Sequence, residues 1–155
     1  MGQLESAAKP LLEPMLAGER ASLTPASQLL FAQWLTLKLM VVDRSTLEFS
    51  AITSSDRAAF YASRAVPNSL RIWLFRSTHP GWNRALRQQA FNRPSDPVMK
   101  MNSKSLTWGF GKLLIYATYA QHPYMDGYPG LDFVGSACEC GRPTTLFRYG
   151  LRAAN

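Results

Sequence analysis

The fold of this chain is decided by one stretch in the second half of the sequence, Lys104-Ser105-Leu106-Thr107-Trp108-Gly109-Phe110-Gly111-Lys112-Leu113-Leu114-Ile115-Tyr116-Ala117-Thr118-Tyr119. It contains two runs rich in β-branched and aromatic residues, which favour extended strands. Only Gly111 separates the two runs, and a glycine inside a strand pattern is typical of a bulge. We therefore expect two strands, 104–110 and 112–119, separated at Gly111 or continuous through a bulge, in an antiparallel sheet.

A further strand is predicted upstream, between Ser69 and Thr78, where aliphatic residues alternate with arginine and aromatic residues. The alternation gives two faces, with Leu70, Ile72 and Leu74 on one and Arg71, Trp73 and Phe75 on the other. The segment 79–83 is predicted to be a turn, because it contains the Pro80-Gly81 pair. Weaker patterns predict a strand or extended link at 46–52, a short helix at 84–91, and edge strands at 131–134 and 144–149.

Helices are expected in the first third of the chain. Apolar residues recur at three- and four-residue steps from Leu4 to Met15, with a kink or a break expected at Pro10. Thr24-Pro25 is a strong helix start and predicts a helix over 25–43. Ser55-Asp56 predicts the cap of a third helix that runs to Arg64.

Helices followed by strands, without βαβ alternation, indicate an α+β fold in which N-terminal helices pack on a small antiparallel sheet. The length of 155 residues fits a single domain over 1–155, with 1–66 mainly helical and 67–155 mainly β with a short helix. No apolar run is long enough to span a membrane, and the N-terminus lacks the pattern of a signal peptide, so we expect a cytoplasmic protein.

Positive charge is concentrated in the middle of the chain. The formal net charge is +7 at pH 7. Between Arg57 and Lys112 there are ten basic residues and one acid, Asp96, so this segment alone carries an excess of +9. A basic segment with interleaved aromatic residues suits an anionic partner, since arginine binds phosphate or carboxylate bidentately and flat rings offer stacking surfaces.

Residue sets for catalysis are missing from the sequence. There is no G-x-S-x-G motif, and Gly109-Phe110-Gly111-Lys112 lacks the spacing and the serine or threonine of a phosphate loop. Cys138 and Cys140 are too few for a tetrahedral zinc site unless His79 and His122 join them. We expect a protein that is not an enzyme and that uses no metal or cofactor.

The residues expected to bind the partner are the arginines and a lysine of the basic segment, with one tryptophan in a predicted turn. They are Arg71, Arg76, Trp82, Arg84, Arg87, Arg93 and Lys104. Trp34, Trp73 and Trp108 are assigned to packing. The alternative is a generally basic, solvated surface with no binding role. A homodimer stays open, through an apolar face near the first helix.

Several short stretches carry a resemblance to a known family. They are Met1-Gly2-Gln3-Leu4-Glu5, the run from Pro10 to Glu19, Leu23-Thr24-Pro25 with Leu30, Ala32, Trp34, Lys38 and Met40, Arg71-Ile72-Trp73-Leu74, and Gly111-Lys112-Leu113-Leu114-Ile115. Together they resemble the segment that follows the catalytic motif in bacterial and phage HNH-endonuclease-like proteins, over residues 1 to 120. The family's zinc-binding cysteines and metal-binding histidines lie upstream of the matching segment. The resemblance therefore implies an accessory part without the HNH zinc and catalytic motif, and it carries over no catalytic residue.

Three functions follow as hypotheses. The first is a non-catalytic interaction protein, of the type found in phages and mobile elements, that binds a nuclease or CRISPR-like nucleoprotein complex and inhibits it, as anti-CRISPR proteins do. The second is a plain DNA- or RNA-binding accessory domain. The third is a metal-dependent nuclease, for which Asp126 and Asp132 are the candidate ligands.

Overall fold

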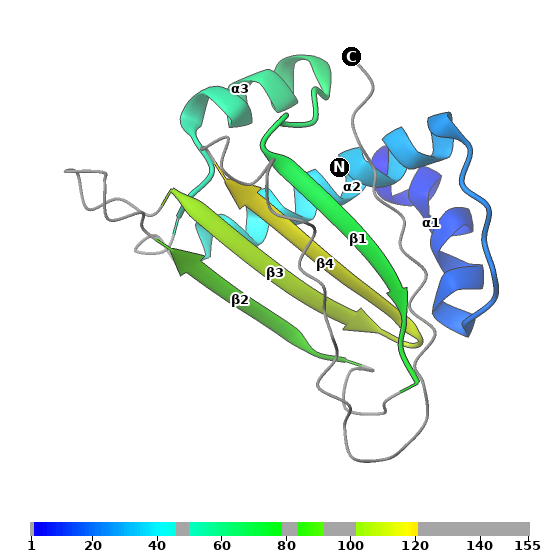
Figure 1. The fold of residues 1–155 in the computed structure, drawn as a ribbon. Coiled ribbons are helices and arrows are strands. Elements are labelled where there is room, and N and C mark those ends of the chain that lie inside the picture. Colours follow the sequence, from blue (N-terminus) through cyan, green and yellow to red (C-terminus); the bar gives the residue numbers. More distant parts are fainter. Residues whose placement is uncertain (1, 46–49, 79–83, 92–101, 121–155) are drawn as a thin grey trace.

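The computed structural model describes residues 2–45, 50–78, 84–91 and 102–120. Figure 1 shows three helices followed by four strands. They are α1 (Gly2–Ala17), α2 (Pro25–Arg44), α3 (Ser54–Ser63), β1 (Leu70–Arg76), β2 (Leu86–Phe91), β3 (Ser103–Phe110) and β4 (Leu113–Ala120). The predicted α+β class, with N-terminal helices and an antiparallel sheet, is confirmed.

The four strands form one sheet in the order β1-β4-β3-β2, and all neighbours are antiparallel. β3 and β4 correspond to the two strands expected at 104–110 and 112–119, and they form a hairpin at the centre of the sheet. Gly111 turns the chain between them with a φ of 53°, a backbone conformation that costs glycine little. Of the two alternatives, the strands are therefore separated at Gly111 and are not continuous through a bulge.

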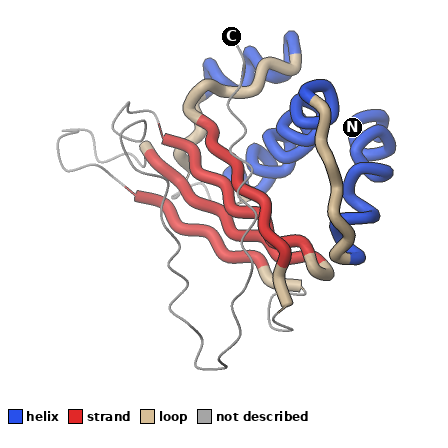
Figure 2. The backbone as a smooth tube through the Cα atoms, turned by 45° about the vertical axis from the view of Figure 1, so that its right-hand side comes forward, coloured by secondary structure: helices blue, strands red, loops and turns tan. Residues whose placement is uncertain are grey.

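One face of the sheet packs against the helices. Its side chains are Leu70, Ile72 and Leu74 of β1, Leu106 of β3, and Leu113, Ile115 and Ala117 of β4, all of them buried. From the helices, Phe31, Leu35 and Met40 of α2 and Phe60 of α3 complete this core. α1 and α2 lie together on one side of the sheet (Figure 2). The predicted apolar face of the first strand thus points into the core.

The predicted start of α2 is confirmed in detail. The Thr24 side chain accepts a hydrogen bond from the Ser27 amide at 3.2 Å, and Pro25 occupies the first helical turn, where its missing N–H is not needed. α3 begins in the same way, but its cap is Thr53 and not Ser55, since the Thr53 side chain accepts from the Asp56 amide at 3.0 Å.

α1 runs without a break through Pro10 and Pro14, so the expected division into two short helices is wrong. The turn between β3 and β4 holds the end of this helix. The Lys112 amide donates to the Leu16 carbonyl at 3.0 Å, and Gly18 follows with a φ of 84°. Residues far apart in sequence thereby satisfy a carbonyl that the helix itself leaves free.

The short helix predicted over 84–91 is also wrong, because Leu86–Phe91 is the strand β2. Its residues pair with β3 along their whole length, from Leu86 opposite Trp108 to Phe91 opposite Ser103. The local sequence favours neither helix nor strand strongly, and pairing with β3 selects the extended conformation. Of the strand or extended link expected at 46–52, residues 50–52 form no strand, and residues 46–49 lie outside the described residues. The edge strands expected at 131–134 and 144–149 and the turn at 79–83 lie outside the described residues.

Candidate functional site

The structure separates the candidate binding residues into three groups. Arg71 and Arg87 lie on the face of the sheet opposite α1 and α2. Arg76 and Arg84 are exposed near the β3–β4 turn. Lys104 lies in the interior, while Trp82 and Arg93 fall outside the described residues. The basic segment is therefore not one continuous patch of all seven side chains.

Lys104 is buried, with 4% of its surface exposed, beside Asp43, which has none. The Lys104 ammonium donates to Asp43 Oδ1 at 2.8 Å, and the Arg57 guanidinium donates to Oδ2. The same carboxylate accepts from the Ser50 hydroxyl and from the amides of Ala51 and Ile52, at 2.8, 3.0 and 3.2 Å. Lys104 therefore does not belong to an exposed cationic surface, because its charge is neutralised inside the fold.

The electrostatics of this cluster favour a charged Asp43. Burial alone would raise the pKa of the carboxyl, but hydrogen bonds from Lys104, the Ala51 amide and the Ser50 hydroxyl outweigh burial and hold the pKa below its usual value. The cluster ties the end of α2 to the segment before α3, to Arg57 of α3 and to β3. We assign it a structural role.

The outer face is defined here as the side of the sheet opposite α1 and α2. Strand alternation and the register give its members as Arg71, Trp73 and Phe75 of β1, Leu114, Tyr116 and Thr118 of β4, Ser105 and Thr107 of β3, and Arg87 and Gln89 of β2. No helix or strand of the described ranges covers this face (Figure 2). It combines aromatic rings, hydroxyl groups and arginines.

The register arranges these side chains in rows across all four strands. One row runs Trp73, Tyr116, Thr107 and Arg87, and the neighbouring row runs Arg71, Thr118, Ser105 and Gln89. Adjacent strands lie about 4.8 Å apart, so each row spans roughly 14 Å. This length is enough for two or three aromatic or polar groups of an extended ligand to lie side by side.

Two rings form the aromatic centre of the outer face. The centroids of Trp73 and Tyr116 are 5.4 Å apart, with an angle of 35° between the ring planes. Both side chains are partly exposed. Partial burial raises the pKa of the Tyr116 hydroxyl, and a hydrogen bond with the Ser105 side chain works in the opposite direction. The phenol is therefore neutral at physiological pH.

The charge of the sheet has one sign. None of the four strands contains an aspartate or a glutamate. On the outer face the cations are Arg71, at the β1 edge, and Arg87, at the β2 edge. Arg87 is exposed, whereas Arg71 is half-buried and donates to the carbonyls of Asn68 and Leu70. An anionic ligand on this face would meet attraction at both edges and no carboxylate from the strands.

Arg76 and Lys112 occupy a different place, at the end of α1. A Cβ built on Gly18 would lie 3.2 Å from Arg76 Nε and 2.6 Å from Lys112 Cδ, so both side chains pass close to this glycine. Cations near the last turn of a helix interact favourably with its dipole. Both side chains therefore stabilise the end of α1, whether or not they also contact a partner.

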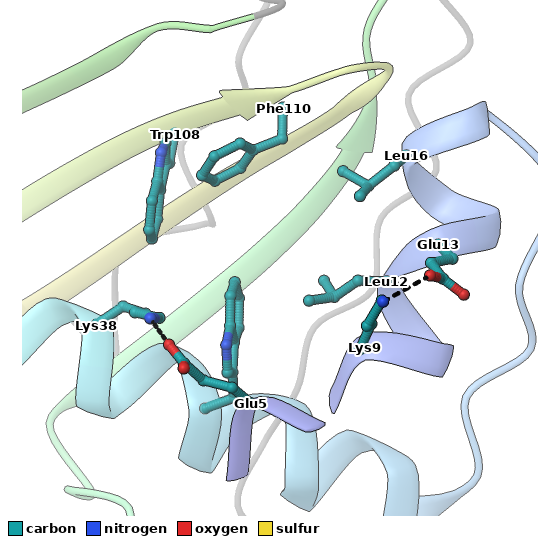
Figure 3. A pocket seen from close by; sticks show the side chains of 9 residues that line it. Glu5, Lys9, Leu12, Glu13, Leu16, Lys38, Trp108 and Phe110 are labelled. Atoms are coloured by element: carbon teal, nitrogen blue, oxygen red, sulfur yellow. Dashed lines mark hydrogen bonds and ion pairs between the residues drawn. The ribbon is translucent and has the colours of Figure 1, made fainter. Parts of the chain in front are cut away.

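Sequence reasoning missed a groove on the helix side of the molecule. It has a volume of about 450 Å³ and is lined by residues of α1, α2 and β3 (Figure 3). Trp34 is buried in the core and Trp108 packs against it, as assigned, and both also form part of the wall of the groove. Trp73, assigned to packing as well, lies on the outer face instead. The alternation over 69–78 already placed Trp73 on the face opposite Leu70, Ile72 and Leu74, whereas no signal in the sequence indicated that Trp34 and Trp108 line a groove.

Metal chemistry finds no support in the part of the chain that the structure describes. Those residues contain no group of three or more histidine, cysteine or acidic side chains placed to hold a metal ion. Cys138, Cys140, His79, His122, Asp126 and Asp132 all lie outside the described residues. Within the described ranges, no helix is both long enough and apolar enough to cross a membrane.

Comparison with known proteins gives no relative. No family model, no curated protein and no solved structure matches the chain.

Proposed function

We propose that this chain is a non-catalytic module that binds single-stranded nucleic acid on the outer face of its sheet. The observation that carries the proposal is the row formed by Trp73, Tyr116, Thr107 and Arg87, which places stacking surfaces and a cation on one face of strands that contain no acid. Base–aromatic stacking contributes about 1–3 kcal/mol per base and tolerates any sequence.

Single strands suit this surface better than duplexes. The bases of a duplex are stacked on one another, so their faces are not available to the rings of a sheet. In a single strand, bases can lie on Trp73 and Tyr116 while phosphates reach Arg71 and Arg87 at the two edges. The Thr107 hydroxyl and the Gln89 amide supply neutral hydrogen bonds between them, while the buried Ser105 side chain hydrogen-bonds Tyr116.

A second candidate is the inhibition of a nuclease or CRISPR-like nucleoprotein complex. The same clustering of arginine with tryptophan and tyrosine favours it, because these residue types are enriched at the centres of protein interfaces. In this case the partner presents carboxylates or a bound nucleic acid to the outer face. Such a role fits the resemblance to an HNH-endonuclease accessory part, acting in the cytoplasm.

Fluorescence anisotropy with a labelled 12-nucleotide oligothymidylate tests the proposal. The wild-type chain should bind the single strand more tightly than the corresponding duplex. On single strands the logarithm of affinity falls with the logarithm of salt by about 0.7 per phosphate contact. Arg87→Gln should therefore lower this slope by about 0.7 and weaken binding.

Arg44→Gln is the matched control, since it removes the same charge from an exposed position in the last turn of α2. Its salt slope should equal that of the wild type. Equal effects of Arg87→Gln and Arg44→Gln would mean that net charge alone drives binding, and the outer face would then have no special role. Absence of binding to either nucleic acid at 50 mM salt would leave the protein-complex candidate as the better explanation.

A further inference from the structure

The groove on the helix side is apolar inside. Leu12 and Leu16 of α1 face Trp108 and Phe110 of β3 (Figure 3). Trp34 of α2 also lines the groove. The rings are in mutual contact: Trp34 and Trp108 are nearly parallel with centroids 6.1 Å apart, and Trp108 and Phe110 are 4.3 Å apart. Such a wall suits apolar groups that enter from outside.

The charges at the rim of the groove neutralise each other. Lys38 is ion-paired with Glu5, and Lys9 Nζ lies 3.7 Å from Glu13 Oε1. Each pair joins one cation to one anion, so the rim has no excess charge to offer a charged ligand. The part of an occupant that enters the groove is therefore apolar and uncharged.

The apolar surface continues from the groove to the edge of the sheet. Leu86 of β2 is the register partner of Trp108, which places it on the same face, and 47% of its surface is exposed. β2 is the last strand in the order, and no element of the described ranges lies beyond it (Figure 1). An edge strand presents backbone N–H and C=O groups that can pair with another extended segment.

On its other face the same strand presents Arg87 and Gln89, both exposed. A segment that pairs with β2 has side chains that alternate between the two faces. One set would lie beside Leu86, next to the groove residue Trp108, and the other beside Arg87. The first position favours apolar residues and the second favours acidic ones.

We infer that β2 and the adjoining groove form a docking site for an extended segment of a partner protein in which apolar and acidic residues alternate. The segment adds to β2 as a fifth strand, places its apolar side chains against Leu86 and Trp108, and places its acidic side chains beside Arg87. Backbone pairing supplies affinity, and the alternate side chains supply specificity. The site shares Arg87 with the aromatic row of the outer face, but its other contacts, the β2 backbone, Leu86 and Trp108, are not part of that row.

Charge complementarity favours this occupant over a second copy of the chain. Antiparallel pairing of β2 with itself about Gln88 places Arg87 opposite Gln89, and it supplies no acid to either arginine. It also brings together two chains that each carry a net charge of +7. An acidic segment removes this repulsion, whereas a second copy adds to it.

Selection from a phage-displayed library of random 12-residue peptides, against the whole chain at 150 mM salt, tests the inference. Enriched peptides should alternate apolar and acidic residues, and Leu86→Lys should weaken the binding of the synthesised peptides at least tenfold. Leu29→Lys is the matched control, since Leu29 is a comparably exposed leucine, 53% exposed on α2. This variant should bind the same peptides as tightly as the wild type does. Arg87→Glu should weaken the same peptides and select basic residues in place of acidic ones.

Three outcomes would overturn the inference: no enriched peptide, enriched peptides without alternation, or equal binding by the Leu86→Lys variant. Sedimentation of the free chain identifies the competing occupant, since a dimer that Leu86→Lys dissociates would assign the β2 edge to a second copy. Leu86→Lys should leave oligothymidylate binding unchanged, because Leu86 lies on the helix side, so the two proposals fail independently.

Discussion

Replacing Asp43 by asparagine should be among the most damaging single changes in the described part of the chain. The variant keeps the shape of the side chain and one acceptor oxygen, but it leaves Lys104 and Arg57 without their counter-charge in the interior. Removing one partner of a buried ion pair costs about 3–5 kcal/mol. Since domains of this size are stable by about 5–15 kcal/mol, about a fifth or more of the total stability is at stake.

Urea unfolding followed by the fluorescence of the packed tryptophans Trp34 and Trp108 measures this loss. The free energy of unfolding falls by about 2 kcal/mol per molar urea, so Asp43→Asn should lower the midpoint of urea unfolding by roughly 2 M. Lys104→Met is the matched comparison, because it keeps most of the side-chain length while Asp43 retains Arg57, Ser50 and two amides. Its cost should be smaller, about 1.5–3 kcal/mol, the range for a hydrogen bond to a charged group.

The pH dependence gives an independent check. Because the pKa of Asp43 is lowered in the folded state, the stability that its charge contributes is present above the pKa of the unfolded chain, near 4, and is lost as the pH falls through the lower folded value. The difference between wild type and Asp43→Asn should therefore shrink in acid. A loss below 1 kcal/mol at pH 7, or costs of Asp43→Asn and Lys104→Met that simply add in the double variant, would refute the structural role of the cluster.

Three further changes test local features of the fold. The Tyr119 hydroxyl donates to Asp56 Oδ2 at 2.6 Å, and burial and this contact raise the pKa of Tyr119 to about 12. The stability that the neutral phenol contributes is therefore complete below pH 10 and is lost as the pH rises through 12. In urea titrations from pH 8 to 12, Tyr119→Phe should lose less stability with rising pH than the wild type, and parallel curves would contradict this. Gly111→Ala should lower the free energy of unfolding by about 2 kcal/mol or more, because φ is positive and the new Cβ would lie 2.6 Å from the Leu16 carbonyl oxygen. Gly2→Ala, which has open space around the new Cβ, should leave the stability almost unchanged in the same thermal melts. Thr24→Ala should cost about 1 kcal/mol through loss of the α2 cap and Thr24→Ser should cost little, and equal melting temperatures for the two variants would argue against the cap.

Local signals in the sequence were sufficient for much of the fold. Thr24-Pro25 determines the start of α2 through short-range hydrogen bonding, and the hairpin around Gly111 follows from two strand-forming runs that flank one glycine. These features depend on residues within a few positions of one another. The strand β2 was missed because Leu86–Phe91 contains both helix-forming and strand-forming residues, and only its pairing with β3 selects the extended state.

The candidate site was predictable only in part, because it depends on contacts between distant residues. Arg71 and Arg87 were found from their charge, and the structure places both on the outer face. Lys104 carries the same charge, but its neutralising partner Asp43 is 61 positions away, and no sequence pattern links the two. The groove escaped prediction for the same reason, since it forms between α1, α2 and β3 only after they have packed.

The central claim is that the outer face binds single-stranded nucleic acid through Trp73 and the arginines at the two edges of the sheet. Nuclear magnetic resonance of the indole N–H groups, during titration with a six-nucleotide oligothymidylate at 50 mM salt, tests it most directly. The Trp73 signal should shift in proportion to bound ligand, while the signals of Trp34 and Trp108 on the helix side stay in place. Shifts confined to Trp34 and Trp108, or no shift at Trp73 when the oligonucleotide is bound, would contradict the account.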